Sequence, residues 1–294
     1  MIASLIAVGI LGLTAWAILG VIGAEKPWLQ LVALGRAALQ LAVLSLVLHT
    51  VISNLWLTFL FLALMTGVAI WTAYKRTPPA LAHPLPIAGA LAAGWMTPVF
   101  VIVALGAVPL SDASKVLAMS GIVIGNSMTA TSLMTRNLTS RLTLGADEYL
   151  AWLSLGATPR QAARPAVREA VSMSVMPSTD QARTTGLVTL PGAFVGALFG
   201  GASAMEAARF QLLVLAAILC AGSITALVLD RTLGAPTTVF VDSSATPAPT
   251  PAPAPTPAPT PAPTSTPAPT STPAPTPAPP AETRPVSRRD SPGN

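Results

Sequence analysis

The apolar residues of this chain are collected into long runs that are separated by short polar stretches. Seven of these runs are long enough to cross a bilayer as a helix, at residues 2–22, 29–51, 56–74, 86–108, 116–134, 186–202 and 210–229. A large soluble helical core would need charged faces between its apolar positions, and these runs almost lack charged residues. The pattern therefore predicts an all-α fold, a polytopic transmembrane helical bundle of about seven spans.

The composition supports this interpretation. Only 9% of the 294 residues are charged and 52% are hydrophobic, whereas a soluble domain carries about 25% charged residues. The single cysteine, Cys220, excludes a disulfide framework or a cysteine metal site within the chain. The first run lacks the basic start and the cleavage site of a secretory signal, so we expect it to be retained as a span. We interpret the net charge of +5 as orientation information and expect no nucleic-acid partner.

The basic residues predict how the chain is oriented. The polar stretch 136–185 holds six arginines, and placing it in the cytoplasm leaves only Lys115 and Arg209 outside among the twelve basic residues near the spans. We therefore expect a multi-pass protein of the cell (inner or plasma) membrane, with its N-terminus outside and its C-terminus in the cytoplasm. The predicted division is spans one to five in 1–135, a cytoplasmic coupling loop in 136–185, spans six and seven in 186–232, and a tail in 233–294.

The C-terminal tail is rich in proline, alanine and threonine. Of the 30 prolines, 18 lie in the last 48 residues. Proline removes backbone donors and fixes φ, so this segment is predicted to be disordered and extended. It is either a cytoplasmic spacer or a docking site for a proline-binding domain.

Small residues recur four apart in two of the runs, at Gly121 and Gly125 and at Gly192, Gly196 and Gly200. This spacing lets helix backbones approach closely in lipid. The glycines serve either ordinary packing within the bundle or the seam of a homodimer.

Residues 146–161 contain the signals for a helix end followed by a helix start. Asp147 and Glu148 open an apolar run that ends at Gly156, a residue that readily adopts positive φ. Thr158 and Gln161 have the spacing of a capping box, with proline at the first helical position between them.

The new helix is expected to be short. Pro165 would remove a donor and clash with the preceding turn, so we predict a helix of about six residues over 159–164, with Arg160 and Arg164 on one face. So short a helix is not stable alone. It either lies on lipid headgroups, with its arginines binding phosphate, or docks into a cytoplasmic ATPase subunit.

Four stretches resemble a known family. GRAALQL (35–41), GIVIGNSM (121–128), LSLGATPRQA (153–162) and MPSTDQARTTGLVTLPG (176–192) are similar, in sequence and order, to the FetB-type permeases of ATP-binding-cassette transporters. That family is associated with bacterial iron export, and its plant relatives with aluminium tolerance. The resemblance implies a permease that exports iron or another metal ion by alternating access.

The resemblance also implies a partner. No lysine of the chain follows glycine in a phosphate-binding Gly-Lys-Ser/Thr loop, so the protein is not expected to be an enzyme or to bind a cofactor itself. ATP and Mg²⁺ would bind a separate cassette ATPase subunit, and a permease homodimer would meet an ATPase dimer. The residues implied to couple the two subunits are Leu155, Gly156, Ala157, Thr158, Pro159, Arg160, Gln161 and Arg164.

Polar residues within the runs are candidates for a substrate path. Asn126 and Ser127 lie in the most polar part of any run, with the thioethers of Met119 and Met128 nearby in sequence. Methionine favours soft ions, whereas Fe(II) prefers imidazole and carboxylate. The alternative is that Asn126 joins helices and the methionines fill gaps in the core.

Charged candidates for the path have structural alternatives too. Arg36 and Gln40 share one face of the second run, as a functional pair or as a loop or helix anchor. Asp180 is expected in the first turn of a second capped helix, with Ser178 and Gln181 as its capping box and Arg183 as a partner. Its carboxylate could instead meet a cation at the inner mouth.

Other functions remain open on the sequence. The chain is alternatively a permease for a different solute, an ATP-independent channel or secondary transporter, or a membrane anchor that displays its tail.

Overall fold

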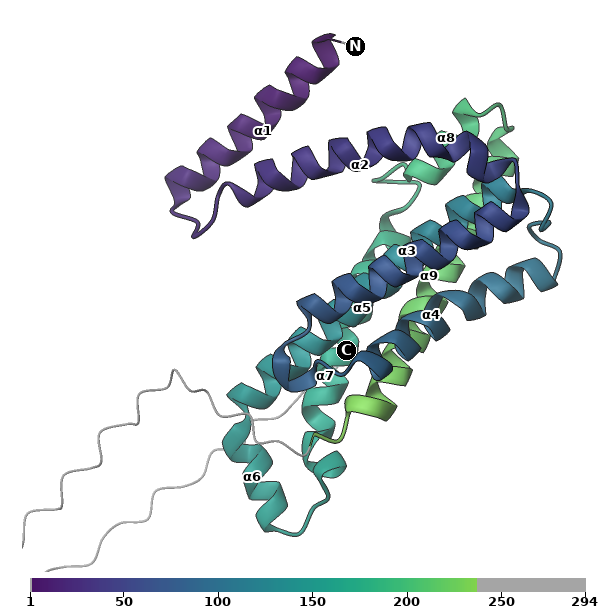
Figure 1. The fold of residues 1–294 in the computed structure, drawn as a ribbon. Helices are drawn as coiled ribbons and strands as arrows, with labels where there is room; N and C mark the ends of the chain where they lie inside the picture. Colours follow the sequence, from purple (N-terminus) through teal and green to yellow (C-terminus); the bar gives the residue numbers. More distant parts are fainter. Residues whose placement is uncertain (1, 237–294) are drawn as a thin grey trace, which may run out of the picture. The chain divides into compact units, whose positions relative to one another are not determined.

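The computed structural model describes residues 2–236, which form nine α-helices and one short 3-10 helix (Figure 1). The helices are α1 (Ile2–Ile22), α2 (Leu29–Ile52), α3 (Leu55–Arg76), η1 (Pro79–Leu81), α4 (Pro84–Ala104), α5 (Ala113–Leu144), α6 (Ala146–Ser154), α7 (Pro159–Thr184), α8 (Gly192–Phe199) and α9 (Ala204–Leu233). Within this part of the chain no named strand occurs, and an isolated bridge joins Thr185 to Thr189. The all-α prediction is confirmed.

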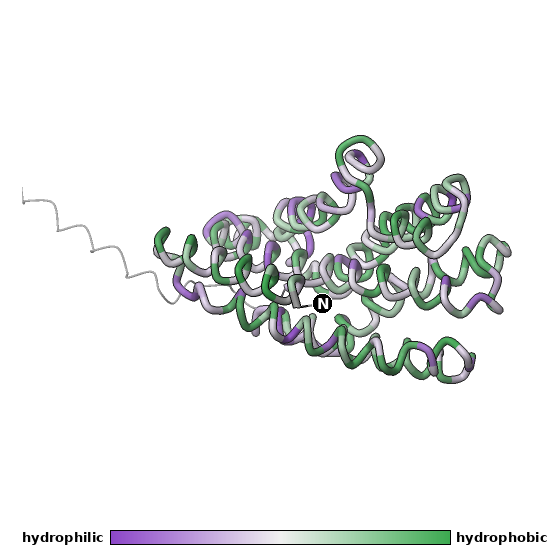
Figure 2. Tube along the Cα trace, turned by 90° about the horizontal axis from the view of Figure 1, so that it is seen from above, coloured by the Kyte–Doolittle hydropathy of each residue, from purple (hydrophilic) through white to green (hydrophobic). Residues whose placement is uncertain are grey.

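Five of the described helices are long and apolar enough to cross a membrane, namely α2, α3, α4, α5 and α9. The apolar stretch Ile6–Ile22 of α1 is shorter. Together these six helices correspond to six of the seven predicted spans, and the hydropathy-coloured tube is mostly green, with short purple interruptions (Figure 2).

The predicted span 186–202 is wrong. That run contains only α8, whose 8 residues would extend about 12 Å at 1.5 Å per residue. Proline at 191 and the positive φ of Gly186 and Gly201 end the helical backbone on either side. Hydropathy alone does not register these breaks.

The centre of the bundle is built from α4, α5 and α9, which contact one another. Helix α3 packs on α5 and α4, and α2 and then α1 follow α3 outward. Helix α7 lies along both α5 and α9, so it is part of the bundle although it is too polar to count among the five spans.

Two groups of buried residues identify the two ends of the bundle. Leu81, Leu142, Ala162 and Leu233 pack together, so η1, the end of α5, the start of α7 and the end of α9 meet there. We call this the α6 end, because Tyr149 of α6 belongs to the same cluster.

The opposite end of the bundle gathers the end of α4 and the starts of α5 and α9. Val99, Val116 and Val214 share a second buried cluster there. Since α8 packs on α9, which begins just after it, we call this the α8 end.

Tyr149 ties the chain after α9 to α6. Its hydroxyl donates a hydrogen bond of 2.6 Å to the carbonyl oxygen of Pro236, and both residues are buried. Of the predicted disordered tail, 233–294, the structure describes only the first four residues, where α9 ends at Leu233 and Pro236 is buried, and residues 237–294 lie outside the described residues.

Candidate functional site

The first candidate site is the α6–α7 hairpin, which we define as residues 146–164. Helix α6 begins with Asp147 and Glu148 in its first turn, as predicted. Gly156 then turns the chain with φ of +87°, in the left-handed region that favours glycine. A side chain at this position would be strained, so the glycine sets the angle between the two helices.

The capping box that starts α7 is confirmed. The backbone N–H of Gln161 donates to Thr158 Oγ1 at 3.4 Å, and the backbone N–H of Thr158 donates to Gln161 Oε1 at 2.9 Å. Pro159 occupies the first helical position, where its missing N–H is not needed.

The predicted six-residue helix over 159–164 is wrong, because α7 continues through Pro165 and Pro177 to Thr184. Pro165 lacks the N–H that would pair with the carbonyl oxygen of Gln161. Both residues are exposed, so this is the one helical hydrogen bond that Pro165 removes. Burial of Ala162, Ala163 and Val167 against the α6-end cluster offsets that loss. The short helix of this region is α6 instead.

The tip of the hairpin exposes large apolar side chains. Leu155 is 81% exposed and Trp152 is 47% exposed, beside the predicted coupling residue Ala157. The described chain leaves most of Leu155 and about half of Trp152 uncovered. Exposed apolar groups next to arginines are typical of a surface that meets a partner or the membrane boundary.

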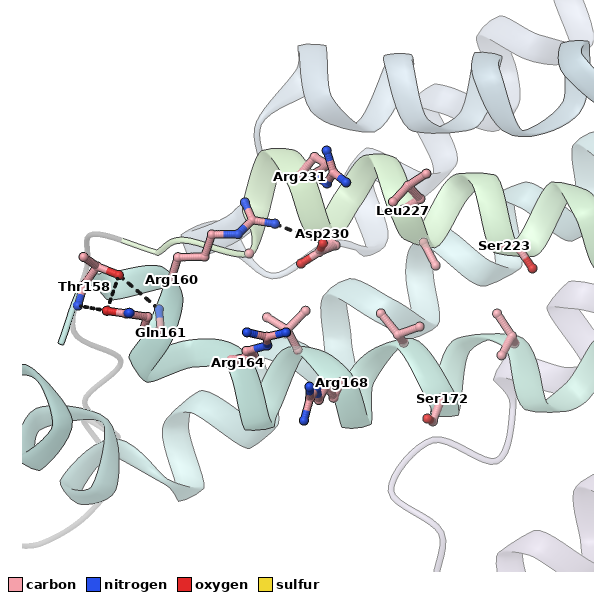
Figure 3. A pocket seen from close by; sticks show the side chains of 15 residues that line it. Thr158, Arg160, Gln161, Arg164, Arg168, Ser172, Ser223, Leu227, Asp230 and Arg231 are labelled. Atoms are coloured by element: carbon pink, nitrogen blue, oxygen red, sulfur yellow. Dashed lines mark hydrogen bonds and ion pairs between the residues drawn. The ribbon is translucent and has the colours of Figure 1, made fainter.

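Arg160 connects the hairpin to α9. Its guanidinium donates to Asp230 Oδ2 at 3.0 Å, across a groove between α7 and α9 (Figure 3). Both side chains are partly exposed, so this pair stabilises the fold little but fixes where the start of α7 lies against the last turn of α9. The groove is lined further by Arg164, another predicted coupling residue.

The second candidate site is a polar pocket of about 300 Å³ between α5 and α7. Ser178 Oγ of α7 donates to Asn126 Oδ1 of α5 at 3.0 Å. Thr129, Ser174 and Gln181 also line the pocket. Its oxygens and amide groups are neutral, so it suits a polar solute or a weakly held cation.

The predicted capping box of Ser178 and Gln181 is wrong. Ser178 and Gln181 lie inside α7 rather than at a helix start, because α7 is uninterrupted from Pro159 to Thr184. Pro177, next to Ser178, leaves the carbonyl of Met173 without a helical donor.

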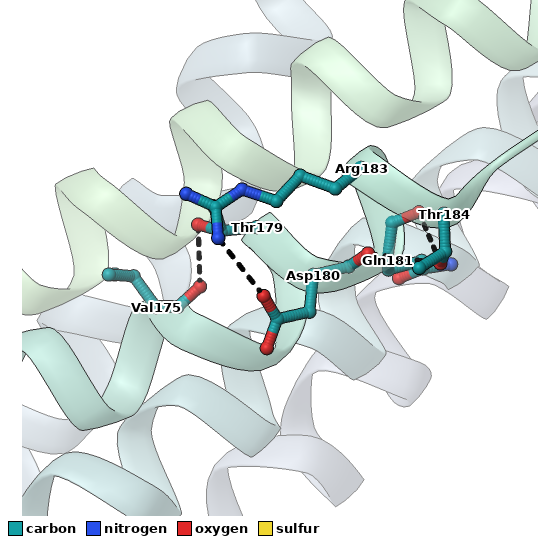
Figure 4. Close-up of polar contacts among 6 residues, drawn as sticks. All are labelled: Val175, Thr179, Asp180, Gln181, Arg183 and Thr184. Carbon is teal, nitrogen blue, oxygen red and sulfur yellow. Dashed lines mark hydrogen bonds and ion pairs between the residues drawn. The ribbon is translucent and has the colours of Figure 1, made fainter.

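Asp180 lies on the exposed surface of α7 and not in a first helical turn. Its Oδ1 accepts from Arg183 at 3.5 Å, the pairing that the sequence predicted (Figure 4). It lies toward the α8 end, so it is not at the mouth nearest the hairpin.

The remaining path candidates do not gather at the Asn126 pocket. Ser127 is buried beside Gly94 in the α4–α5–α9 core, and Met119 is fully buried there too. Met128 packs against a third buried cluster, which is built from residues of α2, α3, α4 and α5. Arg36 and Gln40 are exposed on α2, which contacts α1, α3 and, weakly, α5.

The glycines of the two small-residue stripes differ in their surroundings. A Cβ at Gly121 would meet the Met65 side chain at 3.3 Å, so this glycine allows α3 to approach α5. Gly125, Gly192 and Gly196 face open space, and Gly200 closes α8 as its C-cap. Their part in a homodimer stays a prediction.

Among the described residues, no three histidine, cysteine, aspartate or glutamate side chains are close enough to hold a metal ion together.

Sequence reasoning missed several residues of these sites. Ser178, Asp230 and Tyr149 contribute through contacts 52, 70 and 87 residues away in the chain, which local spacing does not reveal. Arg168 and Arg231 were counted only as orientation charges. The spacing of Arg164 and Arg168, one helical turn apart, was the available signal, but it needed a helix that continues past Pro165.

Comparison with known proteins identifies relatives along most of the chain. The family model described as "Uncharacterised protein family (UPF0014)" matches residues 2–235. The UPF0014 membrane protein YjkA of Bacillus subtilis (strain 168) is 33% identical over 210 residues, which cover 71% of this chain and 83% of the relative.

Two further relatives carry more specific names. The probable iron export permease protein FetB of Escherichia coli (strain K12) is 30% identical over 198 residues, 67% of this chain and 76% of the relative. Protein ALUMINUM SENSITIVE 3 of Arabidopsis thaliana is 31% identical over 203 residues, 66% of this chain and 72% of the relative. No solved structure matches the chain.

Proposed function

The chain belongs to the UPF0014 family, and on that basis we propose that this multi-pass membrane protein is the permease subunit of an ATP-binding-cassette transporter. The observation that carries the proposal is its 30% identity to a probable iron export permease, which extends over 76% of that relative. The α6–α7 hairpin supplies the second support, because it presents uncovered apolar side chains at the basic end of the bundle.

The distribution of charge supports a cytoplasmic α6 end. The basic residues at this end are Lys75, Arg76, Arg136, Arg141, Arg160, Arg164, Arg168 and Arg231. Those toward the α8 end are Lys115, Arg183 and Arg209. By the positive-inside rule, the hairpin and the end of α9 face the cytoplasm.

In this orientation α7 crosses the membrane with α5 and α9, and it replaces the predicted span at 186–202. Its 26 residues extend about 39 Å at 1.5 Å per residue, enough to cross a bilayer. Since polar side chains are costly in lipid, the polar face of α7 lines a second permease subunit or a water-filled path.

The proposed coupling runs through named contacts. An ATPase subunit that holds Leu155 and the turn at Gly156 moves the start of α7, and the Arg160–Asp230 pair passes this movement to α9. Helix α7 then changes its position against α5, where Ser178 meets Asn126. The energy comes from ATP bound by the partner subunit.

Iron, or another metal ion, is the first candidate cargo, because of the name of the bacterial relative. A permease for a different polar solute is the second candidate. It is favoured by the neutral lining of the Asn126 pocket and by the lack of a carboxylate, imidazole or thiolate cluster among the described residues.

The test is co-expression with a candidate cassette ATPase from the same genome, purification through the permease, and measurement of ATP hydrolysis in lipid vesicles with Fe(II), Cu(I), Al(III) and no metal. The proposal expects a stable complex whose hydrolysis rises with at least one metal. A complex without metal stimulation would favour the second candidate cargo.

Two variants test the coupling element. Leu155→Asp should release the ATPase, because it places a charge in an apolar contact. The matched control is Leu144→Asp, which changes a leucine that is also exposed at the α6 end but lies outside the hairpin. Transport that persists without any ATPase would contradict the proposed function.

A further inference from the structure

The groove between α7 and α9 has a volume of about 1070 Å³ and two chemically different ends. At the α6 end it is lined by Arg164 and Arg168 of α7 and by Arg231 of α9 (Figure 3). Farther along it is lined by Val171, Val175 and Leu227.

The two helices arrange this gradient through their periodicity. On α7, residues 164, 168, 171 and 175 follow the spacing of one helical face. Helix α9 runs antiparallel to α7. Its residues 231, 227 and 223, each four residues apart, therefore follow the same groove away from the α6 end. Both walls thus place arginine at the α6 end and become less charged with depth.

The arginines of the groove carry uncompensated charge. Asp230, the acidic residue in the lining, already accepts from Arg160. Among the described residues, Arg164, Arg168 and Arg231 form no ion pair. Arginine side chains that line one groove from both walls attract phosphate groups, which a guanidinium can bind in the bidentate manner.

We propose that this groove is a binding site for an anionic phospholipid, whose headgroup lies at the end lined by Arg164, Arg168 and Arg231 and whose acyl chains lie along Val171, Val175 and Leu227. A soluble phosphate would use the basic end alone and would leave the apolar walls without a partner. An anionic lipid matches both ends, and basic pockets between transmembrane helices are known to hold lipid headgroups. This inference goes beyond the proposed transport function and does not require the ATPase.

The test uses the full chain, purified in an uncharged detergent. Native mass spectrometry with phosphatidylglycerol and phosphatidylcholine of the same acyl chains measures the two apparent affinities. At about 1 kcal/mol for each arginine, a three-arginine site should favour phosphatidylglycerol by about 150-fold. Equal binding of the two lipids would overturn the proposal.

The decisive variant is Arg168→Gln with Arg231→Gln, because neither residue belongs to the proposed coupling set. It should weaken phosphatidylglycerol binding about 30-fold and leave phosphatidylcholine binding unchanged. Lys75→Gln with Arg76→Gln removes the same charge at the same end of the bundle but outside the groove, and should change binding less than about threefold. Equal losses in the two double variants would mean diffuse attraction and would overturn the site.

A steric variant gives an independent measurement. Ser223→Trp, which fills the deeper part of the groove with an indole at an exposed position, should weaken the binding of both lipids. Displacement of the lipid by inorganic phosphate at equal concentration would identify a free-phosphate site. If the arginine variant instead released the ATPase and left lipid preference intact, the groove would be a protein-docking site. Either result would overturn the lipid assignment.

Discussion

Single residues set how closely the central helices of the bundle approach. Gly94 of α4 lies against α5 and α9, where a Cβ would collide with Thr225 Oγ1 and would come within 3.1 Å of Ser127 Oγ and 3.2 Å of the Ala221 carbonyl oxygen. The Thr225 hydroxyl also donates to the carbonyl oxygen of Ala90 at 3.4 Å. A hydrogen atom in place of a side chain is therefore a requirement of this contact.

Gly94→Ala should lower the free energy of unfolding by about 1–3 kcal/mol, because the added methyl overpacks a buried contact. Thermal unfolding of the purified protein in detergent checks this. Gly89→Ala on the same helix meets open space, and should be neutral or stabilising by up to about 1 kcal/mol. The structure would be contradicted if the two variants behaved alike, and Thr225→Ala should partly rescue Gly94→Ala.

At the scale of elements, α7 and α9 both begin with a capping box. Thr158 and Gln161 cap α7 at the α6 end, and Ser203 and Glu206 cap α9 at the α8 end. These boxes have the same local chemistry but differ in their surroundings, since only the first lies in the hairpin that is proposed to meet the ATPase.

Thr158→Ala and Ser203→Ala should therefore cost similar stability, about 1 kcal/mol each, because each removes one cap. Only Thr158→Ala should also lower the ATP hydrolysis of the reconstituted complex. Unfolding midpoints and hydrolysis rates of the two variants check both statements. Equal loss of hydrolysis in the two variants would argue against a specific role for the hairpin.

Tyr149 gives a second prediction at this scale, with a defined pH dependence. Burial raises the pKa of the Tyr149 hydroxyl above its ordinary value. The proton is held more tightly in the folded state, so the stabilisation is complete below about pH 10, the ordinary tyrosine pKa, and is lost as the pH rises through the higher folded pKa. Tyr149→Phe should cost about 1 kcal/mol at neutral pH and remove this alkaline loss, as unfolding scans between neutral and alkaline pH would reveal.

At the scale of the whole bundle, the two ends differ in charge. The α6 end carries Arg160, Arg164 and Arg168 of α7 and the basic residues in the last turns of α3 and α9, whereas the α8 end holds the Asp112–Lys115 pair. The hydrogen bond and charge of Lys115 lower the pKa of Asp112, so this N-cap stays ionised at neutral pH. The orientation proposed above follows from this asymmetry.

Labelling of single cysteines checks the orientation. In a Cys220→Ser background, Leu187→Cys should react with an impermeant maleimide from outside, because residue 187 is 94% exposed beyond the end of α7. Leu144→Cys, at a residue 80% exposed at the α6 end, should react only in inverted or opened vesicles. The reverse pattern would place the hairpin outside and exclude a cytoplasmic ATPase as its partner.

Much of the fold follows from hydropathy, and the exceptions have identifiable physical causes. Six apolar runs predicted six helices, because a bilayer-length run leaves the backbone no other way to satisfy its hydrogen bonds. Helix α7 was not predicted as a span, because its buried face consists largely of small residues such as Ala162, Ala163 and Ala170, between charged positions.

The candidate site was predictable only where its signals are local. The capping box and the turn at Gly156 are encoded within a few residues, and both are confirmed. The Asn126–Ser178 bond and the arginine groove depend on helices that meet only in the folded chain.

The Asn126–Ser178 hydrogen bond has a mechanical consequence for α7. It holds α7 against α5 at Ser178, which lies about 28 Å from the start of α7 and about 9 Å from its end, at 1.5 Å per residue. If α7 rotates as a rigid rod about Ser178, the end of α7 at Thr184 moves only about one third as far as its start at the hairpin. Pro177 removes a helical hydrogen bond next to the Asn126–Ser178 contact, so α7 bends most easily at that contact. Under the proposed coupling, a large displacement of the hairpin would therefore produce a displacement of α7 near the α8 end that is only about one third as large.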